Sequence, residues 1–426
     1  MEKQNVHPLK QANTLIFKVI TAIIVLFYLI NCCTPLRLHV DMLRYFAIKD
    51  CIELGCPADS DAAKDYMPIG YTALLLALSK LGILKSYSIV LINCLYLAGG
   101  LWLIIKMFKS SIHPFFFLII VLLNWTTIKF VTHPLSEMQY LFFSTGSIYL
   151  FYRYTENRRI LYLLSAFVLG AQAFLTRSVG IALFAALVTG LLWLYRKELI
   201  LLVRKNKILV VVMALALIGV MLFSRQLGLN HYTGVFTKQL QEGLTFSTIL
   251  RWHFTEWAEF CFNVSIVKVE GYFPASSGKL VFLVAGILFF AGFLYLLFIR
   301  KNKIPFIVKA YLLFYSLLMF NWPFYDPRFW VPVLPLVAAV VAEGLAAFRK
   351  GLKVPAMVFL IAYISLGVAS VGYITYTSLN RSVFARTQAN GVYRNEYETF
   401  FYGRPQSDTT GHADPNIVDI LRRYDR

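Results

Sequence analysis

The sequence is poor in charged residues, and acidic residues are the scarcer kind. Charged residues make up 15% of its 426 positions, hydrophobic residues make up 58%, and the mean hydropathy is +0.64. An ordinary soluble domain has roughly 25% charged and 45–50% apolar residues. Because one water-soluble core cannot enclose this much apolar surface, the composition excludes a soluble globular enzyme. It predicts an integral membrane protein with many spans.

Several sequence signatures are also missing. There is no internal repeat of roughly 20–50 residues and no low-complexity tract. No DNA- or RNA-binding motif accompanies the net charge of +19, so we expect no nucleic-acid partner and attribute the charge to membrane topology. No set of His, Cys and Asp residues has metal-ligand spacing. Of six cysteines, only Cys51 and Cys56 share an outer loop, and their spacing allows either a disulfide or two free thiols.

Apolar stretches of membrane-spanning length recur along the chain. We expect eleven spans, at residues 14–34, 86–106, 112–131, 138–153, 160–176, 180–195, 207–224, 279–299, 305–321, 329–348 and 354–376. The apolar segment 70–84 is too short to span and is expected to form a membrane-surface or half-inserted helix. The sequence therefore predicts an all-α polytopic membrane protein. Residues 1–376 would form a transmembrane module with outer loops 35–70 and 225–278 that carry juxtamembrane helices, and 377–426 a small outer tail.

Basic residues give the orientation of this module. The short loops on one side of the predicted spans carry most of them, for example Lys106, Arg158, Arg159 and Lys197. Since basic loops stay in the cytoplasm, the N-terminus is expected inside. An odd number of spans then places the C-terminus, and the polar outer turns described next, on the extracytoplasmic side.

Four clusters of polar residues lie at the outer ends of spans, where they would line a wet cavity and not face lipid. The first runs from His39 to Tyr45, and Asp41, Arg44 and Tyr45 share one helix face. An aspartate can take a proton from an attacking hydroxyl or amine, and an arginine can hold a phosphate through paired donors. An ion pair on the helix surface explains the same spacing, so both interpretations stay open.

The second cluster contains Lys129, His133 and Glu137, between two strongly apolar spans. Burying these groups beside hydrocarbon is costly, which favours a functional interpretation for Glu137. A snorkelling Lys129 and a helix that begins with an acid in its first turn are the simpler explanations, and they are favoured for His133 and its neighbours.

The third and fourth clusters are short outer turns that contain an arginine. Arg177 follows one span, and Arg328 closes a turn that includes Tyr325 and Asp326. The positive-inside rule disfavours arginine in such turns, so we favour substrate binding for both. Binding of a lipid headgroup, or a local pair between Arg328 and Asp326, are the alternatives. Together the four clusters predict an outer site for a phosphorylated lipid.

At this point the residues resemble the polytopic glycosyltransferases of the GT-C fold, particularly bacterial relatives of protein O-mannosyltransferases and of the lipid A aminoarabinose transferase. The resemblance covers residues 14–376 through short motifs in the same order: 41–45 (DMLRY), 66–71 (YMPIGY), 133–137 (HPLSE), 175–177 (LTR) and 327–335 (PRFWVPVLP). Two positions differ from the family. Met42 stands where a second acid is usual, and Met67 where some relatives have a basic residue before proline.

The resemblance implies an inverting hexosyl- or pentosyltransferase of the cell envelope, with a polyprenyl-phosphate sugar as donor and a lipid, glycan or protein as acceptor. It would act on the outer face of a bacterial inner membrane. The implied roles are catalysis for Asp41, as general base, and Glu137; donor-phosphate binding for Arg44, Tyr45, Arg177 and Arg328; and lining of the substrate cavity for His39, Tyr66, Lys129, His133, Tyr325 and Asp326. A divalent cation (Mg or Mn) could assist, although Met42 removes the second acid of a paired metal site.

Two other functions stay open. One is a surface-polysaccharide polymerase or ligase that acts on polyprenyl-diphosphate glycan, and the other is a lipid flippase or transporter. A transferase predicts that Asp41, Glu137, Arg177 and Arg328 converge at one outer cavity. A transporter predicts charges along a path through the middle of the membrane.

Overall fold

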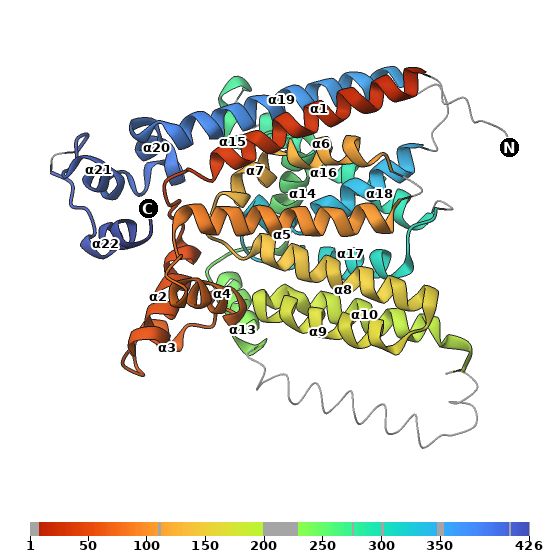
Figure 1. The fold of residues 1–426 in the computed structure, drawn as a ribbon, viewed down its shortest axis with the longest axis horizontal. Helices are drawn as coiled ribbons and strands as arrows, with labels where there is room; N and C mark the ends of the chain where they lie inside the picture. The colour runs from red at the N-terminus through yellow and green to blue at the C-terminus, as the bar shows by residue number, and fades with distance from the viewer. Residues whose placement is uncertain are drawn as a thin grey trace.

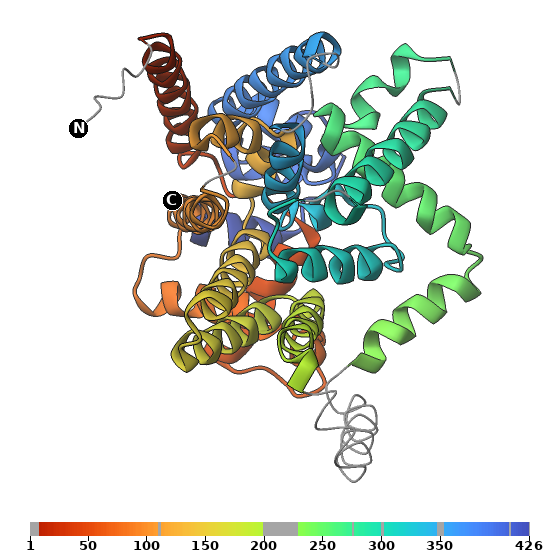
Figure 2. The ribbon, with the colours of Figure 1, turned by 90° about the vertical axis from the view of Figure 1, so that its right-hand side faces the viewer.

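The computed structural model describes residues 8–109, 112–198, 229–274, 277–299, 302–346, 353–408 and 410–425, and every regular element within these ranges is a helix. Long helices run along the long axis of the molecule in Figure 1: α1 (Pro8–Asn31), α5 (Ser86–Met107), α8 (Glu137–Asn157), α9 (Ile160–Thr176), α10 (Ile181–Leu194) and α19 (Lys353–Leu379). Figure 2 looks along this axis, so that α5 and α10 are seen end-on. The architecture is an all-helical bundle, as predicted.

Several of these helices are compatible with a membrane. Within the described ranges, three are long and apolar enough to cross one: Ser86–Met107, Ser277–Phe298 and Met357–Leu379. A fourth results if the bent pair α6 (Pro114–Leu122) and α7 (Trp125–Val131) is one span, and six further apolar helices are shorter. The expected span 207–224 and the first residues of the outer segment 225–278 lie outside the described residues. Eleven spans therefore stay a prediction.

The expected span 112–131 is not one straight helix. Its two halves, α6 and α7, meet at an angle of 71°. Asn124 lies at the break, where its side-chain oxygen accepts from the Thr126 amide at 3.1 Å and caps α7. Its amide nitrogen donates to the Phe260 carbonyl at 3.0 Å and to the Tyr363 hydroxyl at 2.9 Å. The bond to the Thr126 amide stands in for a helical one, and the other two attach the break to distant parts of the chain, which explains why an apolar run bends here.

Two of the three predicted outer segments, 35–70 and 377–426, lie with the short apolar segment 70–84 at one end of the bundle. Six helices lie there, at the left of Figure 1: α2 (Val40–Leu54), α3 (Asp61–Lys64), α4 (Ile69–Lys80), α20 (Arg381–Thr387), α21 (Arg394–Tyr402) and α22 (Pro415–Tyr424). The first turn of α1 lies at the opposite end. Helix α4 has 12 residues, which agrees with a segment too short to span. Of the two alternatives for Cys51 and Cys56, the structure has the disulfide.

The C-terminal tail packs on the extended segment that precedes α2. The Tyr397 hydroxyl donates to the Leu36 carbonyl and accepts from the Leu38 amide, both at 2.8 Å. The Leu36 amide donates to Asp425 at 2.6 Å, and Arg37 donates to Gln388 at 3.0 Å. The tail therefore fixes the extended segment that leads directly into Asp41.

The segment after residue 228 begins with α13 (Leu229–Gln241) and α14 (Phe246–Phe262), and the chain later continues into α16 (Ser277–Leu294). Helix α14 differs from the surface helix expected here, because His253, Glu256 and Trp257 on its inner face are completely or almost completely buried. It lies against α16 so closely that a Cβ atom at Gly286 would be 1.7 Å from the Phe254 carbonyl oxygen. Glycine at 286 permits this approach, and α14 thereby becomes part of the core.

Candidate functional site

Helix α2 presents Asp41 at its first turn. His39 is the N-cap residue, and its Nδ1 accepts from the Asp41 amide at 3.1 Å. An acid near the N-terminus of a helix is stabilised by the helix dipole. The cap and the C-terminal tail together hold the Asp41 carboxylate at the end of the bundle where the outer turns meet.

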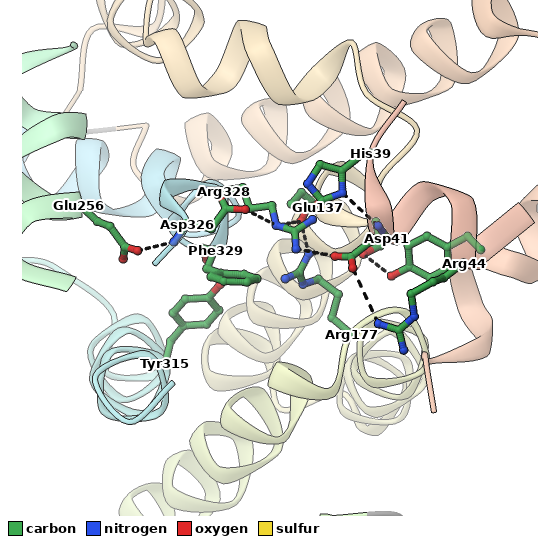
Figure 3. A network of polar contacts seen from close by, with 12 residues as sticks. His39, Asp41, Arg44, Glu137, Arg177, Glu256, Tyr315, Asp326, Arg328 and Phe329 are labelled. Atoms are coloured by element: carbon green, nitrogen blue, oxygen red, sulfur yellow. Dashed lines mark hydrogen bonds and ion pairs between the residues drawn. The ribbon is translucent and has the colours of Figure 1, made fainter. Parts of the chain in front are cut away.

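An ion-pair network joins Asp41 to the two arginine turns (Figure 3). The Arg328 guanidinium pairs with Asp41, and its Nε lies 2.8 Å from Asp326 Oδ2 and 3.9 Å from Glu137 Oε1. The Arg177 guanidinium pairs with Glu137 and lies 3.4 Å from the Ser136 hydroxyl. The four residues singled out as a test from the sequence, Asp41, Glu137, Arg177 and Arg328, therefore form one cluster.

Burial makes this network strong. The side chains of Glu137 and Arg328 are 1% and 9% exposed, against 23% for Asp41. Burial opposes the charged form of Asp41, but the guanidinium of Arg328 outweighs it and holds the pKa of Asp41 below its usual range. Burial also opposes the charge of Arg177, where the Glu137 carboxylate outweighs it and the pKa is raised. Asp41 is therefore a carboxylate at neutral pH.

The network forms one wall of a cavity of about 690 Å³. The other walls come from the 66–68 segment, the Arg177 turn, the start of α10, α13, the end of α17 (Phe306–Met319) and the 321–329 loop. Apolar side chains from three helices, Ile181, Phe236 and Leu318, also line the cavity. A cavity with a few charged groups at one wall and apolar groups elsewhere is typical of a ligand site.

Most of the predicted site residues line this cavity. Nine do so: His39, Asp41, Arg44, Tyr45, Tyr66, Arg177, Tyr325, Asp326 and Arg328. Glu137 lies behind Arg177 and Arg328, buried and out of the cavity wall. His133 and Lys129 are not brought to the cavity. The His133 ring faces Gln388 at 3.2 Å, and the Lys129 ammonium lies over the Phe130 ring at 5.0 Å.

Arg44 and Tyr45 have partners within the protein. Arg44 donates to both oxygens of Asp65, at 2.7 and 2.8 Å, and stacks on the Tyr66 ring at 4.6 Å. Because its planar fork is taken by a carboxylate, Arg44 holds the 65–68 segment against α2. The Tyr45 hydroxyl donates to Ser136 at 3.0 Å, and burial raises the pKa of Tyr45 to about 12, so that the phenol stays protonated.

Sequence reasoning missed three residues that shape this site. Asp65 pairs with Arg44, Glu256 on α14 accepts the Asp326 amide at 2.6 Å, and His253 contacts Glu256 at 2.7 Å. The only sequence signal was the i, i+3 spacing of His253 and Glu256, in a helix that also carries Arg251 and Glu259. Their loop partner is 70 residues away and carries no local mark.

The described residues contain no group of three or more His, Cys, Asp or Glu side chains that could hold a metal ion. A role for Mg or Mn therefore stays a prediction from the resemblance. What the residues do present is a carboxylate beside guanidinium groups, which can accept a proton from one reactant and neutralise an anion on another.

Comparison with protein-family models, curated proteins and solved structures finds no match to this chain. The GT-C resemblance thus continues to rest on the short motifs of the sequence.

Proposed function

We propose that this chain is a membrane glycosyltransferase, which moves a sugar from a polyprenyl-phosphate donor to an acceptor on the extracytoplasmic face. The observation that supports it most is the pairing of Asp41 with Arg328 on the wall of a 690 Å³ cavity. Direct displacement at an anomeric carbon needs a base on the acceptor side and positive charge on the leaving phosphate. Asp41 and the two arginines, Arg177 and Arg328, are groups of these two kinds.

In the proposed reaction, the oxygen or nitrogen of the acceptor forms a bond to the anomeric carbon while its proton passes to the Asp41 carboxylate. The bond between that carbon and the phosphate oxygen breaks, and its electron pair leaves with polyprenyl phosphate. Attack from the face opposite the leaving group inverts the configuration. The guanidinium groups of Arg328 and Arg177 stabilise the phosphate charge, and no step requires a metal.

Arg328 couples the two halves of this reaction. Its guanidinium already pairs with Asp41, which lowers the proton affinity of that carboxylate. A donor phosphate that binds Arg328 competes for the same positive charge and weakens its hold on Asp41. Asp41 then becomes a better base only when the donor is in place, which limits loss of the donor to water.

The cavity walls support a lipid-linked donor. Ile181 and Phe236 are apolar residues of α10 and α13, and Leu318 lies at the end of α17. Such a wall suits the first isoprene units of a polyprenyl chain, whereas the charged wall suits its phosphate. The start of α1 and the site lie at opposite ends of the bundle, which supports a cytoplasmic N-terminus and an outer site. The proposal includes eleven membrane spans, a GT-C fold and a location in a bacterial inner membrane.

The clustering of the charged residues also bears on the rival functions. Asp41, Glu137, Arg177 and Arg328 form one network at one end of the bundle and do not follow a path along it. This favours a transferase over a flippase or transporter. A polymerase or ligase acting on polyprenyl-diphosphate glycan shares the phosphate chemistry and differs in the donor.

The test is turnover by the purified protein in lipid. Polyprenyl-phosphate hexoses and pentoses, labelled in the lipid, are incubated with a mixed extract of lipids, glycans and proteins, and released polyprenyl phosphate is measured. The proposal expects release that depends on both protein and extract. Release only from a polyprenyl-diphosphate glycan would replace it with the polymerase or ligase, and no release from either donor would contradict it.

A further inference from the structure

Two buried residues of α14 contact the loop that carries Arg328 at three points. Glu256 accepts from the Asp326 amide at 2.6 Å through Oε1 and from the Trp330 indole at 2.7 Å through Oε2. His253 lies 2.8 Å from the Trp322 carbonyl through Nε2 and 2.7 Å from Glu256 Oε2 through Nδ1. Both side chains are 0% exposed. The pair therefore clamps the beginning, the middle and the end of the Trp322–Trp330 loop (Figure 3 shows the Glu256 contact).

The chemistry of these contacts fixes how many protons the pair carries. A carbonyl oxygen only accepts, so His253 Nε2 must carry a hydrogen. The contact between Nδ1 and Oε2 then needs a second proton, on one atom or the other. The pair is either imidazolium with carboxylate or neutral imidazole with carboxylic acid, and its net charge is zero in both forms. Full burial favours a pair without net charge over a pair that has lost or gained a proton.

We infer that His253 and Glu256 are positioning residues that share one proton, and that this proton holds the Trp322–Trp330 loop where Arg328 reaches Asp41. The inference rests on the proposed function, because Arg328 is the group that would bind the donor phosphate. Glu256 touches neither substrate nor reacting atoms and acts through the loop. Without these two side chains, these three polar contacts between α14 and the loop are lost. Arg328 then no longer has a fixed distance to Asp41.

The clamp should respond to pH at the alkaline side. If the shared proton leaves, the lone pair of Nδ1 faces a carboxylate oxygen and the contact becomes repulsive. The ionisable side chains that face Glu256, apart from His253, are Tyr325 from the loop, Glu259 from α14 and Tyr315 from α17. All are acids, so none of them favours loss of the proton. Burial likewise raises the pKa of Glu256. The clamp therefore weakens as the pH rises.

The experiment compares Glu256→Ala, Glu256→Gln and a control, Glu398→Gln, in the full-length protein in lipid. The amide oxygen of Gln can accept the Asp326 amide, and its NH2 group can donate permanently to Nδ1 but cannot accept from the Trp330 indole. Gln therefore keeps two of the three contacts of Glu256, whereas Ala keeps none. Glu398 is also a buried carboxylate that accepts backbone amides, at 2.7 and 2.9 Å, but it lies in the C-terminal tail. The first readout is amide hydrogen exchange of residues 321–331, with α8 as an internal reference. The second is the pH profile of kcat/KM for the donor.

We expect faster exchange of the loop in Glu256→Ala, with α8 unchanged, and a fall in kcat/KM of roughly tenfold to hundredfold, as for a misplaced binding group. Glu256→Gln should stay closer to wild type and lose the alkaline fall of kcat/KM, which the wild type and Glu398→Gln retain. Unchanged loop exchange in Glu256→Ala would overturn the inference, and so would faster exchange with unchanged turnover. Faster loop exchange in a protein that turns over no donor would instead overturn the proposed function alone.

Discussion

Replacing Glu137 alone should destabilise the protein more than replacing Glu137 and Arg177 together. The Glu137 carboxylate pairs with the Arg177 guanidinium, and their side chains are 1% and 16% exposed. Removing one partner of a buried pair leaves the other uncompensated and costs about 3–5 kcal/mol, whereas replacing both with apolar residues of similar volume is often close to neutral. We therefore expect a loss of about 3–5 kcal/mol for Glu137→Leu or Arg177→Met, and at most about 2 kcal/mol for the double variant.

The free energy of unfolding of the four proteins can be measured by titration of mixed micelles with a denaturing detergent. A matched control is the exposed pair of Lys238, in the last turn of α13, and Glu242, just after it; their charged atoms lie 3.8 Å apart and their side chains are 74% and 53% exposed. The same cycle there should give a coupling energy below about 0.5 kcal/mol. If the losses of the two single variants at Glu137 and Arg177 simply add in the double variant, the buried network is not a coupled unit and our reasoning fails.

Two further perturbations test the fold and the charge of the site. Gly286→Ala places a methyl group against the Phe254 carbonyl and should lower the melting temperature by several degrees by separating α14 from α16, whereas Gly292→Ala, with no atom within 4 Å, should not. The lowered pKa of Asp41 means that its ionisation stabilises the folded protein above the ordinary value of 3.8 and that this contribution disappears as pH falls through the lowered value. In an acid titration of the unfolding free energy, wild type should therefore lose stability relative to Asp41→Asn over this window, and parallel curves would contradict the Asp41–Arg328 pair.

The local parts of this structure follow from the sequence. An uninterrupted apolar run predicted a span at 86–106, and α5 occupies Ser86–Met107. The placement of polar residues at outer turns predicted that Asp41 and Arg328, which are 287 residues apart, would meet. Both predictions rest on the membrane, because it requires apolar helices of a given length and leaves charged groups few places to go.

What the sequence could not predict depends on individual long-range partners. The bend at Asn124 requires the carbonyl of Phe260 and the hydroxyl of Tyr363, and hydropathy alone gives an unbroken span there. Arg44 was singled out by its spacing from Asp41, and the structure also pairs its guanidinium with Asp65, 21 residues away, which no local pattern indicates. Spacing shows which charged residues share one face of a helix. It does not show which oppositely charged residue from elsewhere in the chain the fold brings nearest to them.

The central claim is that Asp41 accepts the proton in a sugar transfer, and single-turnover measurement of Asp41→Asn tests it most directly. The variant keeps the size of the side chain and loses its ability to take a proton, and Asp59→Asn, an exposed residue of the same outer segment, is the control. With wild type and Asp59→Asn releasing polyprenyl phosphate at equal rates, we expect Asp41→Asn to be slower by about 100-fold or more at unchanged donor affinity. Transfer by Asp41→Asn at the wild-type rate would show that Asp41 is not the base.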